Sequence, residues 1–186
     1  MRCPDCLLQI HRTAEECPHC GMSLLDLRQE FSGMNPIVDD GVQDLAGVLR
    51  KKMRGALVKA FEKAQKQFSN LQLGMCFVDL PQTVKIESYG FWLLNDGVFR
   101  RQAVEIENQG GRVIIVIDMT SKKVTLNAGY MLDDYIAKGE IFDVLANGHA
   151  SLLEGDLVKG GEAMFAALRK YLRKVHRRAV KGRTVK

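Results

Sequence analysis

Four of the five cysteines in this 186-residue chain lie within its first twenty residues, in two nearly identical motifs. The motifs are CPDC at residues 3–6 and CPHC at residues 17–20. Such crowding indicates either a disulfide staple or a metal site. No basic segment followed by an apolar run precedes the first cysteine, so we expect a cytoplasmic protein. Thiols stay reduced in that compartment, where paired Cys-x-x-Cys motifs more often bind metal.

The spacing predicts a tetrahedral zinc ion with four thiolate ligands, and the motifs resemble those of small zinc ribbons. The predicted ligands are Cys3, Cys6, Cys17 and Cys20. Pro4 and Pro18 restrict the backbone in each turn, and we expect a positive φ angle at Gly21. The alternatives are a thioredoxin-like redox dithiol and chance, but a redox motif needs only one pair at a strand-to-helix junction. So short a segment cannot bury a core, so metal binding must supply its folding energy, roughly 10–16 kcal/mol in apparent terms.

The composition leaves room for the zinc ribbon and one further domain of ordinary size, with 46% hydrophobic and 26% charged residues. No apolar run approaches the roughly 20 residues that cross a bilayer, so we predict no transmembrane segment. The net charge of +5 is unevenly distributed. Residues 169–186 contain nine Lys and Arg and no acid, so the 168 residues before them carry a net charge of −4.

We predict four regions: a zinc ribbon over residues 1–25, a linker over 26–43, an α/β domain over 44–178 and a basic tail over 179–186. Gly, Pro, Asn and Ser interrupt any hydrophobic period in the linker, which has room for one helical turn around residues 24–31. The tail begins where the apolar period of the preceding segment stops.

The first half of the α/β domain reads as helix, strand, helix. Apolar residues recur every three or four positions from 45 to 68, which predicts an amphipathic helix capped near Asp44. A short apolar run at 71–80 predicts a buried strand. A second helix is expected over 83–95, with three side chains facing inward, Tyr89, Trp92 and Leu93.

The second half reads as a hairpin followed by two helices. Residues 110–118 contain five consecutive β-branched residues, which is typical of a strand covered on both faces. Alternating residues at 124–129 predict that this strand forms an antiparallel hairpin. Helices are expected over 131–150 and 157–178. Together these elements predict an α/β fold with a mixed central sheet and helices on both faces.

Two stretches of this domain resemble the TPM domain family: DLAGVL at residues 44–49 and GRVIIVIDMTSKKVTLNAGY at 111–130. The resemblance spans residues 38–175. Family members usually continue with Gly-Tyr-Gly-Leu-Glu, whereas residues 129–133 read Gly-Tyr-Met-Leu-Asp, which keeps an acid but loses the second glycine. The resemblance implies an α/β/α sandwich and the phosphatase activity of some members. Zinc-ribbon fusions to this domain fit a cytoplasmic, bacterial member, although many relatives are exported and membrane anchored.

The resemblance also implies a divalent cation held by clustered carboxylates. Asp79 and Asp118 stand where predicted strands end, the place where open sheets bind ligands. Asp133 and Asp134 stand at an expected helix start just past the hairpin. Carboxylates that converge on one crevice would need a cation such as Ca²⁺ or Mg²⁺. The alternatives are helix capping for Asp133 and Asp134 and a simple turn at Asp79.

We expect the protein to act as a binding or scaffold module with a protein partner in a larger assembly. The alternative is a metal-dependent, phosphatase-like hydrolase. The sequence contains no phosphate loop, nucleophile elbow or Cys-x5-Arg loop. Cys76 is expected to be a buried structural thiol, and neither His149 nor His176 has a recognisable catalytic partner.

The basic tail suggests a further alternative, weak contact with nucleic acid or another anionic surface. Nonspecific binding of this kind would weaken steeply with salt. Sequence-specific nucleic-acid recognition is not expected, because the only aromatic residue near the tail is Tyr171, which belongs to the inward face of the last helix.

Overall fold

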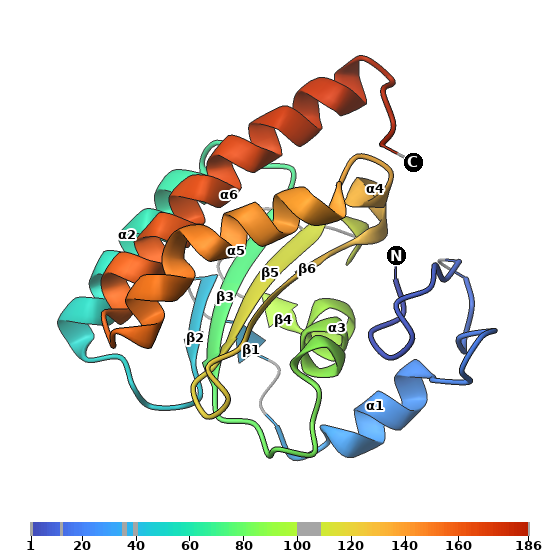
Figure 1. Ribbon diagram of the computed structural model, residues 1–186, viewed down its shortest axis with the longest axis horizontal. Helices are drawn as coiled ribbons and strands as arrows, with labels where there is room; N and C mark the ends of the chain where they lie inside the picture. The colour runs from blue at the N-terminus through green and yellow to red at the C-terminus, as the bar shows by residue number, and fades with distance from the viewer. Residues whose placement is uncertain (1, 12, 35–36, 39–40, 100–108, 186) are drawn as a thin grey trace.

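A four-stranded mixed sheet forms the centre of the protein in a computed structural model (Figure 1). The structure describes residues 2–11, 13–34, 37–38, 41–99 and 109–185. In spatial order the strands are β2 (Val42–Asp44), β3 (Gln72–Val78), β5 (Arg112–Asp118) and β6 (Val124–Ala128). The first three run parallel, and β6 returns antiparallel to β5. The predicted hairpin is therefore confirmed.

A second, two-stranded sheet lies beside the first. It consists of β1 (Ile37–Val38) and β4 (Val98–Phe99), which pair in parallel. These strands, like β2, were not predicted, because two or three residues are too few to show a hydrophobic period.

Three helices cover one face of the central sheet (Figure 1). They are α2 (Lys51–Gln65), α5 (Lys138–Leu153) and α6 (Leu157–Val180). Their apolar side chains form one buried cluster with every second residue of the central strands. The buried residues of α6 include Leu157, Met164, Leu168, Tyr171, Leu172 and Val175.

The other face is covered by α3 (Ile86–Asp96) and by the N-terminal segment, which contains α1 (Leu24–Glu30). Figure 1 shows this segment and α3 together on the side of the sheet opposite α5. The rings of Phe31, Tyr89 and Trp92 pack within 5.3–5.5 Å of one another, measured between centroids. All three predicted inward residues of α3 are buried.

The β5 strand shows why its sequence does not alternate. Val113, Ile115 and Ile117 join the cluster beneath the three helices. Ile114 and Val116 point the other way, into the cluster beneath α3. Both faces of the strand are dry, so an unbroken apolar run is what the fold requires. The architecture is therefore the predicted α/β/α sandwich.

The helix expected from residue 45 begins six residues later, at Lys51, and its N-cap is Arg50 rather than Asp44. Asp44 instead ends β2, and its carboxylate accepts the N–H groups of Val48 (3.1 Å) and Leu49 (2.8 Å). Gly47, with φ of 65°, turns the chain between strand and helix. The predicted helix had therefore been extended over the turn at residues 45–50, which has no hydrophobic period of its own.

The helix expected over 131–150 is divided. A single turn, α4 (Tyr130–Asp133), is followed by α5, which starts at Lys138. At the end of the chain α6 runs to Val180, and the N–H of Val185 donates to the carbonyl of Asp134 (2.9 Å). After α6 the described chain therefore returns toward α4.

Candidate metal centre

Two turns with the same backbone hydrogen bonds present the four N-terminal cysteines. In the first turn the N–H of Cys3 donates to the carbonyl of Leu8 (2.9 Å), and the N–H of Leu7 donates to the carbonyl of Cys3 (2.9 Å). The same two bonds recur 14 residues later, both at 2.8 Å. An isolated antiparallel bridge closes each turn. The repeated sequence motif is thus a repeated backbone structure.

The residue after the second cysteine of each motif has a left-handed backbone. Gly21 has a φ of 75°, as predicted, and Leu7 occupies the equivalent position with a φ of 62°. A leucine in this region clashes with its own backbone, whereas a glycine does not. The first turn therefore carries strain that the second avoids.

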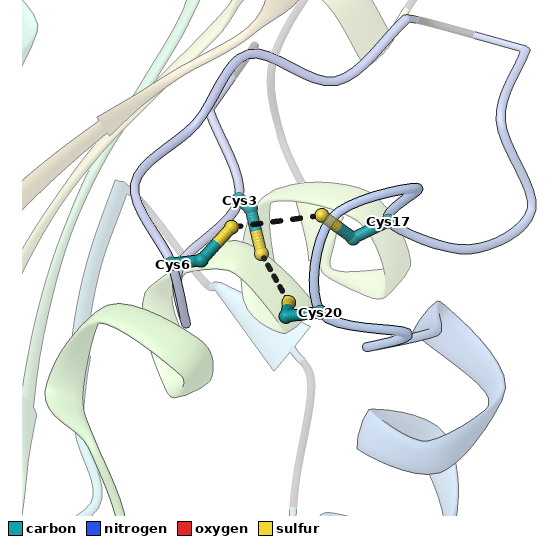
Figure 2. Close-up of side chains that lie close together, drawn as sticks. All are labelled: Cys3, Cys6, Cys17 and Cys20. Atoms are coloured by element: carbon teal, nitrogen blue, oxygen red, sulfur yellow. Dashed lines mark hydrogen bonds between the residues drawn. The ribbon is translucent and has the colours of Figure 1, made fainter.

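The four sulfur atoms converge between the two turns (Figure 2). The Sγ atoms of Cys3 and Cys20 are 3.5 Å apart, and those of Cys6 and Cys17 are 3.6 Å apart. All four lie within 4.8 Å of one another. A disulfide would need about 2 Å. Zinc–sulfur bonds of about 2.3 Å place tetrahedral ligands about 3.8 Å apart, so this donor set fits a metal such as zinc.

Backbone N–H groups point at the buried sulfur of each turn. Those of Asp5 and Cys6 donate to the Cys3 sulfur. The equivalent pair in the second turn, the N–H groups of His19 and Cys20, donates to the Cys17 sulfur. Hydrogen bonds of this kind favour the thiolate, which is the form that binds metal.

The thiols do not all ionise with equal ease. Burial raises the pKa of Cys17, but the donated hydrogen bonds outweigh it and lower the pKa to about 7. For Cys20 a hydrogen bond from the N–H of Met22 lowers the pKa, whereas burial and the neighbouring sulfurs raise it to about 12. Burial raises the pKa of Cys3 as well. Four thiolates at these distances repel one another, so a divalent cation is the partner that lets all of them ionise.

The metal centre is continuous with the core beneath α3. Cys3 and Cys17 are buried in the same cluster as Leu27, Phe31 and Trp92. Leu27 and Phe31 lie in the predicted linker, residues 26–43, where their burial was not predicted although both are large apolar residues four positions apart.

Three polar contacts also tie the N-terminal segment to the rest of the chain. Arg28 forms a bidentate ion pair with Asp96 at the end of α3, with its closest contact at 2.8 Å. Lys85 pairs with Asp5 between the cysteines of the first motif. The side-chain amide of Gln9 donates to Asp133 (3.3 Å). Exposed contacts of this kind contribute little energy singly. The first two join the segment to the two ends of α3, and the third joins it to α4.

Asp118 is buried at the end of β5, where its carboxylate stabilises a turn. It accepts the N–H groups of Leu80 (3.1 Å), Thr120 (3.1 Å) and Ser121 (3.3 Å), and the hydroxyl of Ser121. Asp79 is exposed beside it and accepts the hydroxyl of Thr120 (3.2 Å). The predicted proximity of these two strand ends is present, with the carboxylate of Asp118 already engaged.

Asp133 and Asp134 lie at the other end of the sheet. Asp133 is the last residue of α4 and Asp134 follows it, so neither starts a long helix. In the hairpin register Ala128 is opposite Val113, five residues along β5 from Asp118, which is about 16 Å. Figure 1 shows α4 and the hairpin turn at opposite ends of β6. The expectation that all four carboxylates share one crevice is therefore wrong, and the predicted antiparallel hairpin already implied this separation.

Cys76 lies in the middle of β3, fully buried, 3.9 Å from the hydroxyl of Tyr89. Burial raises its pKa to about 12, so the thiol stays protonated. The imidazole of His149 contacts the carbonyl of Lys122 (2.9 Å). Cys76 is therefore the buried structural thiol that the sequence predicted.

Among the described residues, no helix has the length and apolar character needed to span a lipid bilayer. Nor do the described residues contain another group of three or more Cys, His, Asp or Glu side chains close enough to hold a metal ion.

Comparison with known proteins agrees with this architecture. The model of the TPM domain family matches residues 42–171. The solution NMR structure of the N-terminal domain of the cg2496 protein from Corynebacterium glutamicum is 14% identical and covers 70% of this chain and 78% of its own, with a TM-score of 0.53. That of the N-terminal domain of a protein from P. gingivalis is 16% identical and covers 78% and 87%, with a TM-score of 0.55. At these identities the likeness is one of fold. A comparison with curated proteins finds no match.

Proposed function

The chain belongs to the TPM domain family, and from this premise we propose that it is a zinc-dependent binding module that joins a larger protein assembly. The observation that carries the proposal is the closed set of four thiols packed on α3. Structural zinc sites fill all four positions with protein ligands, whereas catalytic sites leave one open for water or substrate. Zinc bound by Cys3, Cys6, Cys17 and Cys20 would therefore shape a surface and leave no position for a reactant.

In this role the zinc ion would hold two turns rigid against α3. The exposed residues of the turns, including Leu7 and Leu8, would then present a preformed surface to a protein partner. Rigid presentation lowers the entropy that binding costs. We also propose a cytoplasmic location in a bacterial cell, where the thiols stay reduced and available to zinc.

A metal-dependent phosphatase of TPM type has weaker support. Family membership and the adjacent Asp79 and Asp118 favour it. The four hydrogen bonds accepted by Asp118 and the distance to Asp133 and Asp134 count against a shared Ca²⁺ or Mg²⁺ site. A cation there would have to displace hydrogen bonds that hold the turn together.

Contact of the basic tail, residues 179–186, with an anionic surface is a separate prediction. Lys186 lies outside the described residues. If the tail acts in this way, removing it will lower retention on anionic vesicles in low salt and leave zinc content unchanged.

One experiment separates the two main functions. Full-length protein and the variants Cys20→Ser and Asp118→Asn are purified with zinc, assayed for metal content and for turnover of a phosphomonoester with Mg²⁺ or Ca²⁺, and used to recover partners from native lysate. We expect one zinc per wild-type chain, no turnover, and a partner that Cys20→Ser loses and Asp118→Asn retains. Turnover that Asp118→Asn abolishes would replace the binding module with the hydrolase.

A further inference from the structure

An open groove of about 700 Å³ lies between α2 and α6, which pack side by side in the helical layer (Figure 1). We call it the α2–α6 groove. Its uncharged lining is small or apolar and consists of Gly55, Ala56, Ala60, Phe165 and Ala166. Its charged lining consists of Lys52, Lys59, Lys63, Glu162 and Arg169. It is far from the metal centre, which lies across the sheet on the α3 face.

Four of the five charged groups in the groove are cations, and within the described part of the chain none of them has a carboxylate at ion-pair distance. Arg169 donates a hydrogen bond to the neutral side chain of Gln67 (3.4 Å). Farther along α6 the arrangement is different, because Lys174 and Arg178 are both paired with Glu140. The cations of the groove are therefore not neutralised by ion pairs within the described part of the chain.

The lysines of α2 follow one another along the groove. From Lys52 to Lys63 the helix rises about 16 Å, which is three turns. Between them the small residues Gly55, Ala56 and Ala60 let another backbone come close. A helix with alanine or leucine on one side and carboxylates on its flanks matches both features, since its apolar side meets the alanines while its acids reach the lysines.

Two other anionic partners match less well. Single-stranded nucleic acid binds through exposed aromatic rings as well as cations, and the one ring in the lining, that of Phe165, is 1% exposed. A membrane surface meets protruding cations, whereas these cations line a hollow whose apolar part a flat bilayer would leave uncovered.

We infer that the α2–α6 groove is the docking site for an acidic amphipathic helix of a partner protein. The inference rests on the proposed binding function and gives it a second surface and a partner of defined chemistry. Carboxylates on the partner would steer its approach and fix its register, and the apolar contact would hold it.

The test uses full-length protein and a fluorescent synthetic helix of about 18 residues, long enough to fold when bound, with glutamates on one side and leucine and alanine on the other. Fluorescence anisotropy should show saturable binding that weakens with salt. A peptide of the same composition, scrambled to remove the apolar side, should bind about tenfold more weakly, a loss of about 1.4 kcal/mol.

Two variants test the site itself. Lys59→Glu with Lys63→Glu should lower the affinity about tenfold or more, because two cations become repulsive acids. Gly55→Leu should also lower it, because the new side chain occupies the groove; the Cβ itself meets no atom within 4 Å, so the side chain starts in open space. The matched control is Lys51→Glu, which reverses one charge on the same helix outside the lining; compared with the single variant Lys59→Glu, it should leave affinity nearly unchanged.

Several results would overturn the docking site. They are no binding of the amphipathic peptide, equal binding of the scrambled peptide, an equal loss in Lys51→Glu, and no loss in Gly55→Leu. Preferred binding of single-stranded DNA or of phosphatidylglycerol vesicles that Gly55→Leu leaves unchanged would also overturn it. Circular dichroism of each variant confirms folding. Zinc content and recovery of a partner from lysate are measured in parallel, so failure of the groove is distinguishable from failure of the binding module.

Discussion

The two faces of the central sheet are covered in different ways. One face is covered by three helices, and the apolar side of each helix packs on the sheet in one buried cluster. The other is covered by α3, by an N-terminal segment whose described residues form one short helix and two cysteine turns, and by Val38 and Phe99 of the two-stranded sheet. Where helices are long, hydrophobic burial stabilises the layer. Where the chain is irregular, four thiols form a site whose metal would add to the apolar burial of Leu27 and Phe31.

The single tryptophan of the chain reports on the second face alone. Trp92 is 4% exposed, and its ring packs against that of Phe31 in the N-terminal segment, 5.3 Å away. Loss of the segment would expose this indole to water. Circular dichroism is dominated by the long helices of the first face, so the two signals follow the two layers separately.

The largest effect is expected from loss of the metal. Chelation, or the change Cys17→Ser, should remove an apparent 10–16 kcal/mol of metal-coupled folding energy and release the N-terminal segment from α3. Trp92 emission should shift to longer wavelength, and protease should cleave before residue 34, while most helical signal persists. The fifth cysteine provides the control, since Cys76→Ala should keep both the zinc and the native emission. Simultaneous loss of helix and tryptophan signals would show that the faces do not separate.

The next effect concerns the helical face. Gly148 of α5 lies against α6, and a Cβ there would be 2.1 Å from the carbonyl oxygen of Gly160. The change Gly148→Ala must push the helices apart, which costs about 1–3 kcal/mol. Urea unfolding followed by circular dichroism measures this cost.

The change Gly55→Ala is the matched control, because a Cβ there meets nothing within 4 Å. It should stabilise the protein by up to about 1 kcal/mol through helix propensity alone. Equal stability of Gly148→Ala and Gly55→Ala would mean that the close approach of α5 and α6 does not limit packing on this face.

A smaller effect is expected from the ion pair that joins α5 to the end of α6. Arg178 donates to Glu140 (2.6 Å) and, with Lys174, lowers the pKa of this carboxyl from 4.5 to about 2. Because the folded pKa is depressed, the pair stabilises the protein fully above pH 4.5 and loses this contribution as the pH falls toward 2. Lys174 is half exposed, so we expect about 1 kcal/mol.

The change Glu140→Gln should therefore lower stability by this amount at pH 7 and by nearly nothing at pH 2. Unfolding midpoints of both proteins across this range give the difference. A difference that does not change with pH would assign the effect to packing.

The smallest effect sharpens the comparison within the metal centre. Leu7→Gly should relieve the strain of the left-handed backbone in the first turn. Glycine also loses more conformational entropy on folding, so we expect a net gain in stability of about 0.5 kcal/mol. Competition with a chelator should show about twofold tighter zinc binding. Leu8→Gly, next to it and without a positive φ, should give no gain. Weaker zinc binding in Leu7→Gly would mean that the leucine side chain itself supports the turn.

Much of the fold could be predicted because its signals are local. The run of β-branched residues from Val113 to Ile117 requires a strand buried on both sides, and the stripe ending at Val175 requires a buried helical face. Two features had no local signal. The strand Val42–Asp44 exists through pairing with Met75 to Phe77, more than thirty residues away. The start of α2 depends on the turn at Gly47.

In the candidate site, too, one part could be predicted from local signals and another could not. Ligation by cysteine is specified by spacing, since two ligands on one tight turn are positioned by the turn itself. The convergence of the four sulfur atoms could therefore be predicted from residues 3–20 alone. The acidic residues were harder, because their grouping depends on which ends of the strands meet. Asp79 and Asp118 meet on parallel strands, whereas the antiparallel return of β6 carries Asp133 away.

By itself the sequence determined the four-cysteine cluster, the hairpin and the burial of the last helix, because spacing and periodicity act over one turn or one strand. Only the tertiary structure decided that the cysteine turns rest on α3, that Asp118 holds a turn, and that α2 and α6 enclose a cationic groove. Hydrophobic burial has no direction, so an apolar face does not name the surface that covers it. Which faces meet is settled by the packing of the whole chain.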